Sequence, residues 1–258
     1  MRKIRILYTR NNRSFNNFQG LVKDYLWQNI LPEIIHLPLI DSRKISINSR
    51  EFNYAKEADF IIFTSQSAVN FYPEKLLKNN ANSGEFAAIG KITEQALRVK
   101  IKAIIQADDD VKIISPKDNF TSEELLKELK INNKRVAIIT AKGGRNLLYS
   151  ELAKNNQCEF IFCYERFNPQ ENQHIDTEKL QDISAILISS NSALENLERS
   201  LPVNLTQLLK SQAVLVAFSE RIAETARQNN WQKVLAANQT SELAQLQILD
   251  SYFFSLGD

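Results

Sequence analysis

Two short stretches of the sequence bring hydroxyl and amide side chains together where an apolar run meets a helical pattern. In "IIFTSQSAVNFY" the apolar run stops at Thr64, and apolar residues resume at Ala68 with helical spacing. Small polar side chains at such a turn cap the helix. A hydroxyl-rich turn with free N–H groups also suits a carboxylate or a phosphate. Both roles stay open for the polar residues of this turn, which are Thr64, Ser65, Gln66 and Ser67.

The stretch "ILISSNSALENL" repeats this pattern in the second half of the chain, with the polar residues Ser189, Ser190, Asn191 and Ser192. Three further pairs of segments recur in the same order. They are "RILYTR" with "RVAIITAKGGR", "FAAIGKITEQALR" with "LVAFSERIAETAR", and "TSEELLKEL" with "TSELAQLQI". A repeat of this length is a whole domain rather than one unit of a solenoid, so we predict an internal duplication.

Short apolar runs alternate with amphipathic segments within each copy. We predict strands at Ile4–Thr9, Phe60–Thr64, Ala87–Ile89, Lys102–Gln106, Val136–Thr140, Phe160–Tyr164, Ala185–Ser189, Ala213–Ala217 and Val234–Ala237. Helices fill the intervals, with predicted N-caps at Ser67, Thr121 (with Glu124 completing a capping box), Ser192 and Thr240. This alternation predicts an α/β fold with parallel sheets that are covered on both faces.

The polar turns fall where a parallel sheet binds its ligands. Such ligands lie beyond the carboxyl ends of the strands, at the N-termini of the helices. Two parallel-sheet domains would therefore present two sets of anion-binding turns, which we expect to face each other across a cleft.

The composition is that of an ordinary globular protein, with 43% apolar residues, 24% charged residues and a net charge of +2. This charge gives no signal for nucleic acid. No apolar run approaches the ~20 residues that a membrane span needs, and no secretion signal is visible, so we expect a cytoplasmic protein. Cys158 and Cys163 have an odd separation along one predicted strand, which puts them on opposite faces as passive residues. His36 and His174 lack metal-ligand spacing, and we expect no metal.

The chain resembles the uroporphyrinogen-III synthases of the tetrapyrrole (haem) pathway along nearly its whole length. The resemblance rests on "YTR" near the start, "FTSQSAV", "AAIGKITEQAL", "GGRNLL", "CYER" and "SERIAETARQNNW". Each motif is weak by itself, and their order, spacing and duplication make the resemblance specific.

This resemblance implies two similar flavodoxin-like α/β domains between which the chain crosses twice. One domain would combine 1–35 with 173–258, the other would span 42–165, and 36–41 and 166–172 would be linker strands. The duplication alone would instead divide the chain into 1–130 and 131–258. Pro38 and Pro169 suit linkers better than cores. The resemblance also implies a monomer.

The implied reaction is the cyclisation of hydroxymethylbilane to uroporphyrinogen III, with loss of water and inversion of ring D. No cofactor is needed. The substrate carries eight carboxylates, which polar turns at helix N-termini would hold. The cationic end would attack the substituted carbon of ring D through a spiro intermediate, and holding the substrate in that geometry would be the main task of the enzyme. A transient contact with hydroxymethylbilane synthase is a further partner consistent with the resemblance.

Several residues are candidates for binding this substrate. They are Thr9, Arg10, Thr64, Ser65, Gln66, Gly90, Thr93, Thr121, Lys142, Gly143, Gly144, Arg145, Ser189, Ser190, Asn191, Ser219, Arg221 and Ile222. Each has a plainer role as well: the hydroxyls cap helices, Gly90 makes a tight turn, and the arginines form surface ion pairs or stay solvated. The family carries a hydroxyl where "FSERIA" has Arg221 and Ile222, so this site departs from the pattern. The segment from Lys142 to Arg145 lacks the spacing of a phosphate-binding P-loop.

Tyr164 matches the position of the family's one candidate acid–base tyrosine. Its hydroxyl would hydrogen-bond the departing hydroxyl of the substrate, while the alternative is an aromatic ring that packs at the end of a strand.

Two other functions fit parts of the pattern. A two-domain binding or sensor protein for a polycarboxylate would use the same cleft without catalysis, although such proteins commonly carry an export signal. A nucleotide-dependent enzyme would need a glycine-rich first turn, which "YTRNNRSF" lacks.

Overall fold

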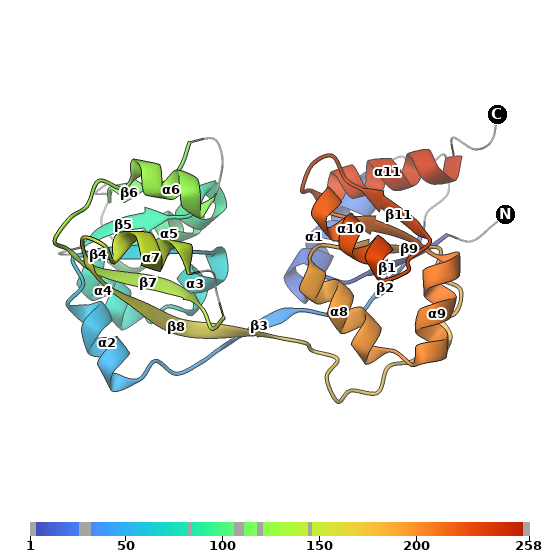
Figure 1. The fold of residues 1–258 in the computed structure, drawn as a ribbon, viewed down its shortest axis with the longest axis horizontal. Helices are drawn as coiled ribbons and strands as arrows, with labels where there is room; N and C mark the ends of the chain where they lie inside the picture. The colour runs from blue at the N-terminus through green and yellow to red at the C-terminus, as the bar shows by residue number, and fades with distance from the viewer. Residues whose placement is uncertain are drawn as a thin grey trace. The chain divides into compact units, whose positions relative to one another are not determined.

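The computed structural model describes residues 4–25, 32–81, 84–105, 111–117, 121–143 and 146–254. The chain divides into two compact units (Figure 1). Unit 1 comprises Met1–Asp41 and Phe167–Asp258, and unit 2 comprises Ser42–Arg166. Each unit has a parallel sheet with helices on both faces, which confirms the predicted α/β fold.

The described strands of unit 1 form a flavodoxin-like sheet. They are β1 (Arg5–Tyr8), β2 (Glu33–His36), β9 (Ala185–Ile188), β10 (Val214–Ala217) and β11 (Lys233–Ala236). Neighbours pair in parallel in the order β11-β10-β9-β1-β2. Numbered along the chain, the order is 2-1-3-4-5, which is that of flavodoxin-like sheets.

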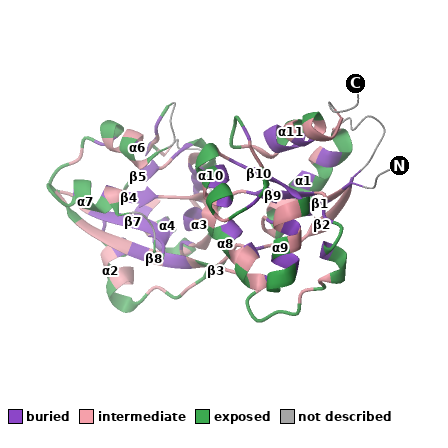
Figure 2. Cartoon of the chain, turned by 45° about the vertical axis from the view of Figure 1, so that its right-hand side comes forward, coloured by how far each residue is buried: buried purple, intermediate pink, exposed green. Residues whose placement is uncertain are grey.

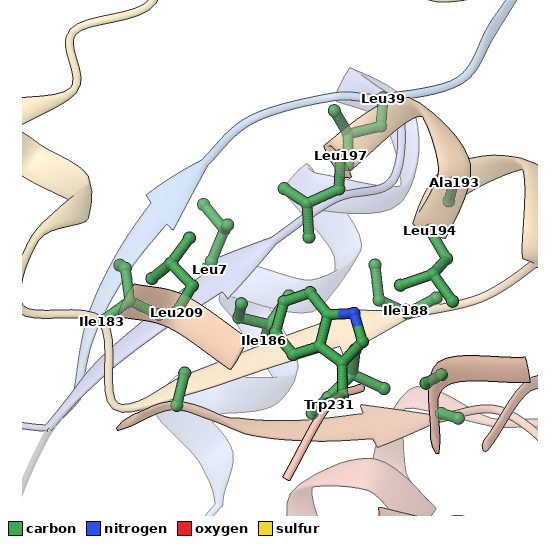
Figure 3. Packing of buried hydrophobic residues seen from close by; sticks show 14 of the residues in the cluster. Leu7, Leu39, Ile183, Ile186, Ile188, Ala193, Leu194, Leu197, Leu209 and Trp231 are labelled. Carbon is green, nitrogen blue, oxygen red and sulfur yellow. The ribbon is translucent and has the colours of Figure 1, made fainter. Parts of the chain in front are cut away.

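Alternate residues of these strands build two cores, because successive side chains of a strand point to opposite faces. Leu7 and Ile186 lie in the cluster of α8 (Asn191–Ser200), α9 (Val203–Gln212), α10 (Glu220–Gln228) and the turn η1 (Glu178–Leu180). Figure 3 shows this cluster around Trp231. Ile6 and Leu187 lie in the cluster of α1 (Asn12–Asp24) and α11 (Glu242–Phe254).

Unit 2 has a second sheet of the same kind, in the order β3-β8-β7-β4-β5-β6. The strands are β3 (Asp41–Lys44), β4 (Phe60–Phe63), β5 (Glu85–Ala88), β6 (Ile113–Ile114), β7 (Arg135–Ala141) and β8 (Gln157–Phe167). The neighbours in the series β8-β7-β4-β5-β6 pair in parallel. Figure 2 shows that the central strands of each sheet are buried and that the outer faces of the helices are exposed.

Helices also pack on both faces of the unit 2 sheet. One core cluster includes residues of α2 (Ser49–Lys56), α3 (Gln66–Phe71), α4 (Glu74–Ala81) and α5 (Lys91–Ile105). The cluster on the opposite face includes residues of α6 (Ser122–Glu128) and α7 (Leu147–Leu152). Cys158 and Cys163 belong to different clusters, as the predicted opposite faces require.

The two sheets repeat one strand order. The turn "FTSQSAV" follows β4, and its repeat "ISSNSAL" follows β9. When β4 is matched with β9, the order β6-β5-β4-β7-β8 superposes on β11-β10-β9-β1-β2. The recurring segments of the sequence therefore occupy equivalent places in the two sheets.

Some predicted elements are wrong. Residues Lys102 to Ile105 end α5 instead of forming a strand, and Gln106 lies outside the described residues. Leu97 and Ile101 are buried four residues apart, so the apolar run continues a helical stripe. The short strands β2, β3 and β6 were not predicted, and β2 includes His36, which was assigned to a linker.

Three predicted caps are shifted by one or two residues. Ser65 caps α3 and Ser190 caps α8, in place of Ser67 and Ser192, which lie inside these helices. The Ser241 hydroxyl accepts from the N–H of Ala244 at 3.2 Å, in place of Thr240. Each capping residue precedes its helix, and its oxygen meets the N–H three residues later. Thr121 caps α6 as predicted, while Glu124 pairs with Lys127 at 2.7 Å.

Candidate functional site

Each sheet has one switch point, where the order of its strands along the chain reverses. In unit 1 it lies between β1 and β9, and in unit 2 it lies between β4 and β7. Ligands of such sheets bind beyond the carboxyl ends of the strands that flank this point. The loops after these four strands, with the first residues of α3 and α8, contain most of the predicted site residues: Thr9 and Arg10, Ser189 to Asn191, Thr64 to Gln66, and Lys142 with Gly143.

A threonine hydroxyl bridges the two strands at both switch points. Thr9 Oγ1 donates to the carbonyl oxygen of Leu187 at 2.6 Å, and Thr64 Oγ1 donates to that of Ile139 at 3.0 Å. Thr9 is 1% exposed. These two hydroxyl protons are therefore used to join strands, and the threonines fix the loops that follow them.

The loop after β9 carries the polar start of α8. Ser190 Oγ accepts from the N–H of Ala193 at 3.2 Å. Asn191 Nδ2 donates to Thr225 Oγ1 at 3.2 Å, whereas its Oδ1 is buried without a hydrogen-bond partner in the described part of the chain. Ser189 and Ser190 are partly exposed, so their polar atoms remain available at this switch point.

A charged cluster after β1 was not predicted. Glu242 Oε1, at the start of α11, accepts from the Tyr8 hydroxyl and forms an ion pair with Arg10 Nη1 at 2.7 Å. The Arg10 guanidinium also lies 5.4 Å from the ring centroid of Phe218. Burial and the bond to Glu242 raise the pKa of Tyr8, so this phenol stays protonated and donates. The sequence signal for Glu242 was the repeated "TSE", whose glutamate is the first residue of α11.

His36 completes this cluster from β2. Its Nε2 is 2.8 Å from the carbonyl oxygen of Arg10, and its ring stacks on Phe15 with centroids 4.0 Å apart. Burial lowers the pKa of His36, and its hydrogen bond to Arg10 partly opposes that shift. The imidazole thus holds the backbone of the loop that presents Arg10.

We expect Glu242→Ala to lower the free energy of unfolding by about 1–3 kcal/mol, because it leaves the buried Tyr8 hydroxyl without its acceptor. Urea unfolding followed by circular dichroism measures this loss. The matched control is Glu220→Ala, which breaks the exposed pair with Arg227 and should cost less than about 1 kcal/mol. Equal losses in the two variants would contradict the role given to Glu242.

Tyr164 reaches the switch point of unit 2 through a bulge. Along β7 and β8, Thr140 pairs with Phe162 but Ala141 pairs with Tyr164, so Cys163 is the extra residue. The bulge turns Tyr164 onto the face that Cys163 also occupies, where both lie in the core cluster of α3. There the Tyr164 hydroxyl lies 2.8 Å from Ser65 Oγ, and its ring stacks on Phe71 at 5.8 Å.

Lys100 holds the C-terminal end of α3, a role that no sequence pattern indicated. Its Nζ donates to the carbonyl oxygens of Val69 at 2.6 Å, Asn70 at 3.1 Å and Tyr72 at 2.7 Å. A cation is favourable at the carbonyl end of a helix. Burial lowers the pKa of Lys100. Burial raises the pKa of Cys163 to about 12, which keeps this thiol protonated and passive, as predicted.

The other predicted residues lie in loops or at helix starts. Gly90 is buried before α5, Thr93 is 5% exposed inside it, and the cap Thr121 is exposed. Lys142 and Gly143 are exposed, and Gly143 has a φ of 79°, a conformation that favours glycine. Gly144 and Arg145 lie outside the described residues.

Three further predicted residues lie at the start of α10, in different environments. Ser219 precedes this helix without a side-chain cap bond, and Arg221 is exposed. Ile222 is 3% exposed in the core of unit 1, so its side chain serves the fold and not a ligand.

No group of three or more His, Cys, Asp or Glu side chains among the described residues is placed to hold a metal ion. None of the helices described is both long and apolar enough to cross a membrane.

Comparisons with known proteins give consistent matches. The family model "Uroporphyrinogen-III synthase HemD" matches residues 32–244. The chain is 26% identical to the uroporphyrinogen-III synthase of Escherichia coli (strain K12) over 226 residues, 83% of this chain and 89% of that protein. It is 27% identical to that of Salmonella typhimurium over 206 residues, 75% and 79% of the two chains. The fold is similar to uroporphyrinogen-III synthetase from Helicobacter pylori 26695, with a TM-score of 0.61 and 15% identity over 98% of this chain and 100% of that chain.

Proposed function

Because this chain belongs to the uroporphyrinogen-III synthase family, we propose that it converts hydroxymethylbilane to uroporphyrinogen III, with loss of water and inversion of ring D. The enzyme is a cyclising lyase of haem biosynthesis. The observation that carries this conclusion is the match of the family model to residues 32–244, which is most of the chain. This match disfavours the alternative of a polycarboxylate-binding protein without catalysis.

The polar loops and helix starts that follow the strands of both sheets suit the carboxylate arms of this substrate. In unit 1 the candidates are Arg10, Ser189, Ser190, Asn191, Ser219 and Arg221. In unit 2 they are Ser65, Gln66, Gly90, Thr93, Thr121, Lys142, Gly143, Gly144 and Arg145. Hydroxyls, backbone N–H groups and guanidinium groups are the donors that carboxylates accept from most strongly. In this proposal the loops hold the substrate, and geometry selects the inverted product.

Tyr164 assists the departure of the substrate's hydroxyl group in this proposal. When the hydroxymethyl C–O bond breaks, the electron pair leaves with oxygen and a cation remains on the substrate. The hydroxyl of Tyr164 lies 2.8 Å from Ser65 Oγ at the carboxyl end of β4, and hydrogen bonding from this pair of hydroxyls toward the departing oxygen assists that step. Three finer expectations rest on the resemblance: a monomer, a cytoplasmic location and a transient contact with hydroxymethylbilane synthase.

The purified chain, without added metal or nucleotide, is expected to form the type III isomer from enzymatically made hydroxymethylbilane. The products are oxidised, the porphyrin isomers are separated, and each is quantified by absorbance. Heat-unfolded protein serves as the control and should yield only the type I isomer of the uncatalysed ring closure. If the folded protein also yields only type I, the proposed function is wrong.

A further inference from the structure

The hydroxyls of Tyr164 and Ser65 form a pair in which one member is buried and the other is accessible. Tyr164 is 1% exposed, whereas Ser65 is partly exposed at the turn between β4 and α3. The oxygen atoms are 2.8 Å apart. A molecule bound at this turn therefore reaches the hydroxyl of Ser65, and the phenol lies behind it.

The donors and acceptors available to Ser65 and Tyr164 determine the direction of their hydrogen bond. A serine hydroxyl has one O–H donor and two lone pairs. The N–H of Ala68 donates to Ser65 Oγ at 3.0 Å and uses the first lone pair. If Ser65 donated to Tyr164, the phenol proton would need another acceptor, and among the described residues its hydrogen-bond partner is Ser65. Because an unsatisfied buried donor is costly, Tyr164 donates and fills the second lone pair.

This arrangement leaves the O–H of Ser65 with no acceptor inside the pair. The Ser65 hydroxyl already accepts two hydrogen bonds, from Ala68 and from Tyr164. Hydrogen bonds in such a chain polarise one another, so the Ser65 O–H becomes a stronger donor. The position of the pair is fixed from three sides. The bulge at Cys163 aims Tyr164, Phe71 stacks on its ring, and Lys100 holds the end of α3.

We propose that Ser65 is the catalytic residue that touches the departing hydroxyl of the substrate, and that Tyr164 is a positioning residue that acts through it. This proposal rests on the proposed function and deepens it. As the C–O bond breaks, its electron pair goes to oxygen, which takes the Ser65 proton and leaves as water. Ser65 takes the proton of Tyr164, and the proton that ring D releases on final ring closure restores the phenol.

The test is a double-mutant cycle with Ser65→Gly and Tyr164→Phe. Glycine is tolerated at a cap position nearly as well as serine, so this change removes the hydroxyl with little loss of helix stability. We expect each single variant to lower kcat tenfold to a hundredfold with little change in KM, and Tyr164→Phe to add no further loss once Ser65 is Gly. Ser65→Thr retains a hydroxyl and should keep kcat within a few-fold of the wild type.

A second measurement does not depend on activity. The ¹³Cζ resonance of Tyr164 reports its hydrogen bond, so it should shift in Ser65→Gly and stay in place in Ser65→Thr. Asn48→Ala, which removes the capping box of α2 in the same unit, is the control for cap loss and should leave kcat unchanged.

Two results would overturn the proposal. In the first, Ser65→Gly keeps kcat within a few-fold of the wild type. In the second, Tyr164→Phe still costs tenfold in the Ser65→Gly background, which means that the phenol acts directly. Failure of the proposed function would give a distinguishable result. The wild-type protein would then form only the type I isomer, whether or not the ¹³Cζ resonance of Tyr164 shifts in Ser65→Gly.

Discussion

A fragment spanning residues 42–166 is expected to fold cooperatively by itself, whereas a fragment spanning residues 1–130 is expected to stay unfolded. The first contains all six strands of the unit 2 sheet apart from the first residue of β3 and the last residue of β8. The second keeps β4 but loses β7, whose buried residues Val136 to Ile139 pair with all of β4. It also separates β1 from β9. An open sheet edge of this kind leaves apolar surface and backbone groups unpaired.

Far-UV circular dichroism and urea unfolding measure this difference. A fragment of residues 1–166 is the matched control, because it adds β7 and β8 to the failing fragment and keeps the same N-terminus. It should regain a cooperative transition. The predicted domain division of the chain, with 1–35 joined to 173–258, would be wrong if the 1–130 fragment unfolded cooperatively with native-like dichroism.

Tyr164→Phe is expected to lower kcat between tenfold and about a hundredfold. The change keeps the ring that stacks on Phe71 and removes one hydrogen bond, to Ser65. A hydrogen bond at a centre of developing charge is worth about 1–3 kcal/mol, and about 1.4 kcal/mol is tenfold in rate. The product should still be the type III isomer, since the way the substrate is held, and not the phenol, selects ring D.

The control for this variant is Tyr72→Phe. Tyr72 is also 1% exposed and donates to Asn80 Oδ1 at 2.9 Å, so its loss should reduce stability by a similar amount. It should leave kcat unchanged. Initial rates at saturating substrate give kcat for both variants, and equal values for Tyr164→Phe and the wild type would make Tyr164 a packing residue.

Most of the fold could be predicted from the sequence because its strands are short continuous apolar runs. The runs "FIIF" in β4 and "AILI" in β9 are fully buried, and turns with hydroxyl groups follow both. The elements that failed did so for two different reasons. β6 is two residues long, which is too short for an apolar run, whereas residues 102–105 have the apolar character of a short strand although they form the last turn of α5. The short length of this apolar run favours a strand, whereas the helical spacing of Leu97 and Ile101 before it favours a continued helix, and the structure has the helix.

The candidate site was predictable only in part, since its contacts depend on long-range geometry. The turns at Ser65 and Ser190 were visible because the motif is local and repeated. The bond between Ser65 and Tyr164 depends on a bulge that no local pattern at Cys163 indicates. The pair of Arg10 with Glu242 joins residues from opposite ends of the chain. The preferences of residues at helix caps were enough to predict the polar turns. The side chains that contact each turn depend on tertiary packing, which these preferences do not contain.

The hydrogen bond from Thr9 to Leu187 spans 178 positions of the chain, which has a consequence for synthesis on the ribosome. At about 5–20 residues per second, β1 is made on the order of 10–40 s before β9, one of the two strands that it pairs with. Unit 2 is completed in that interval, while Ile6 and Leu7 can pair with β2 but lack β9 on their other side. The nascent N-terminus is therefore the segment on which chaperones would act, and long-range closure of unit 1 is the slow step of folding.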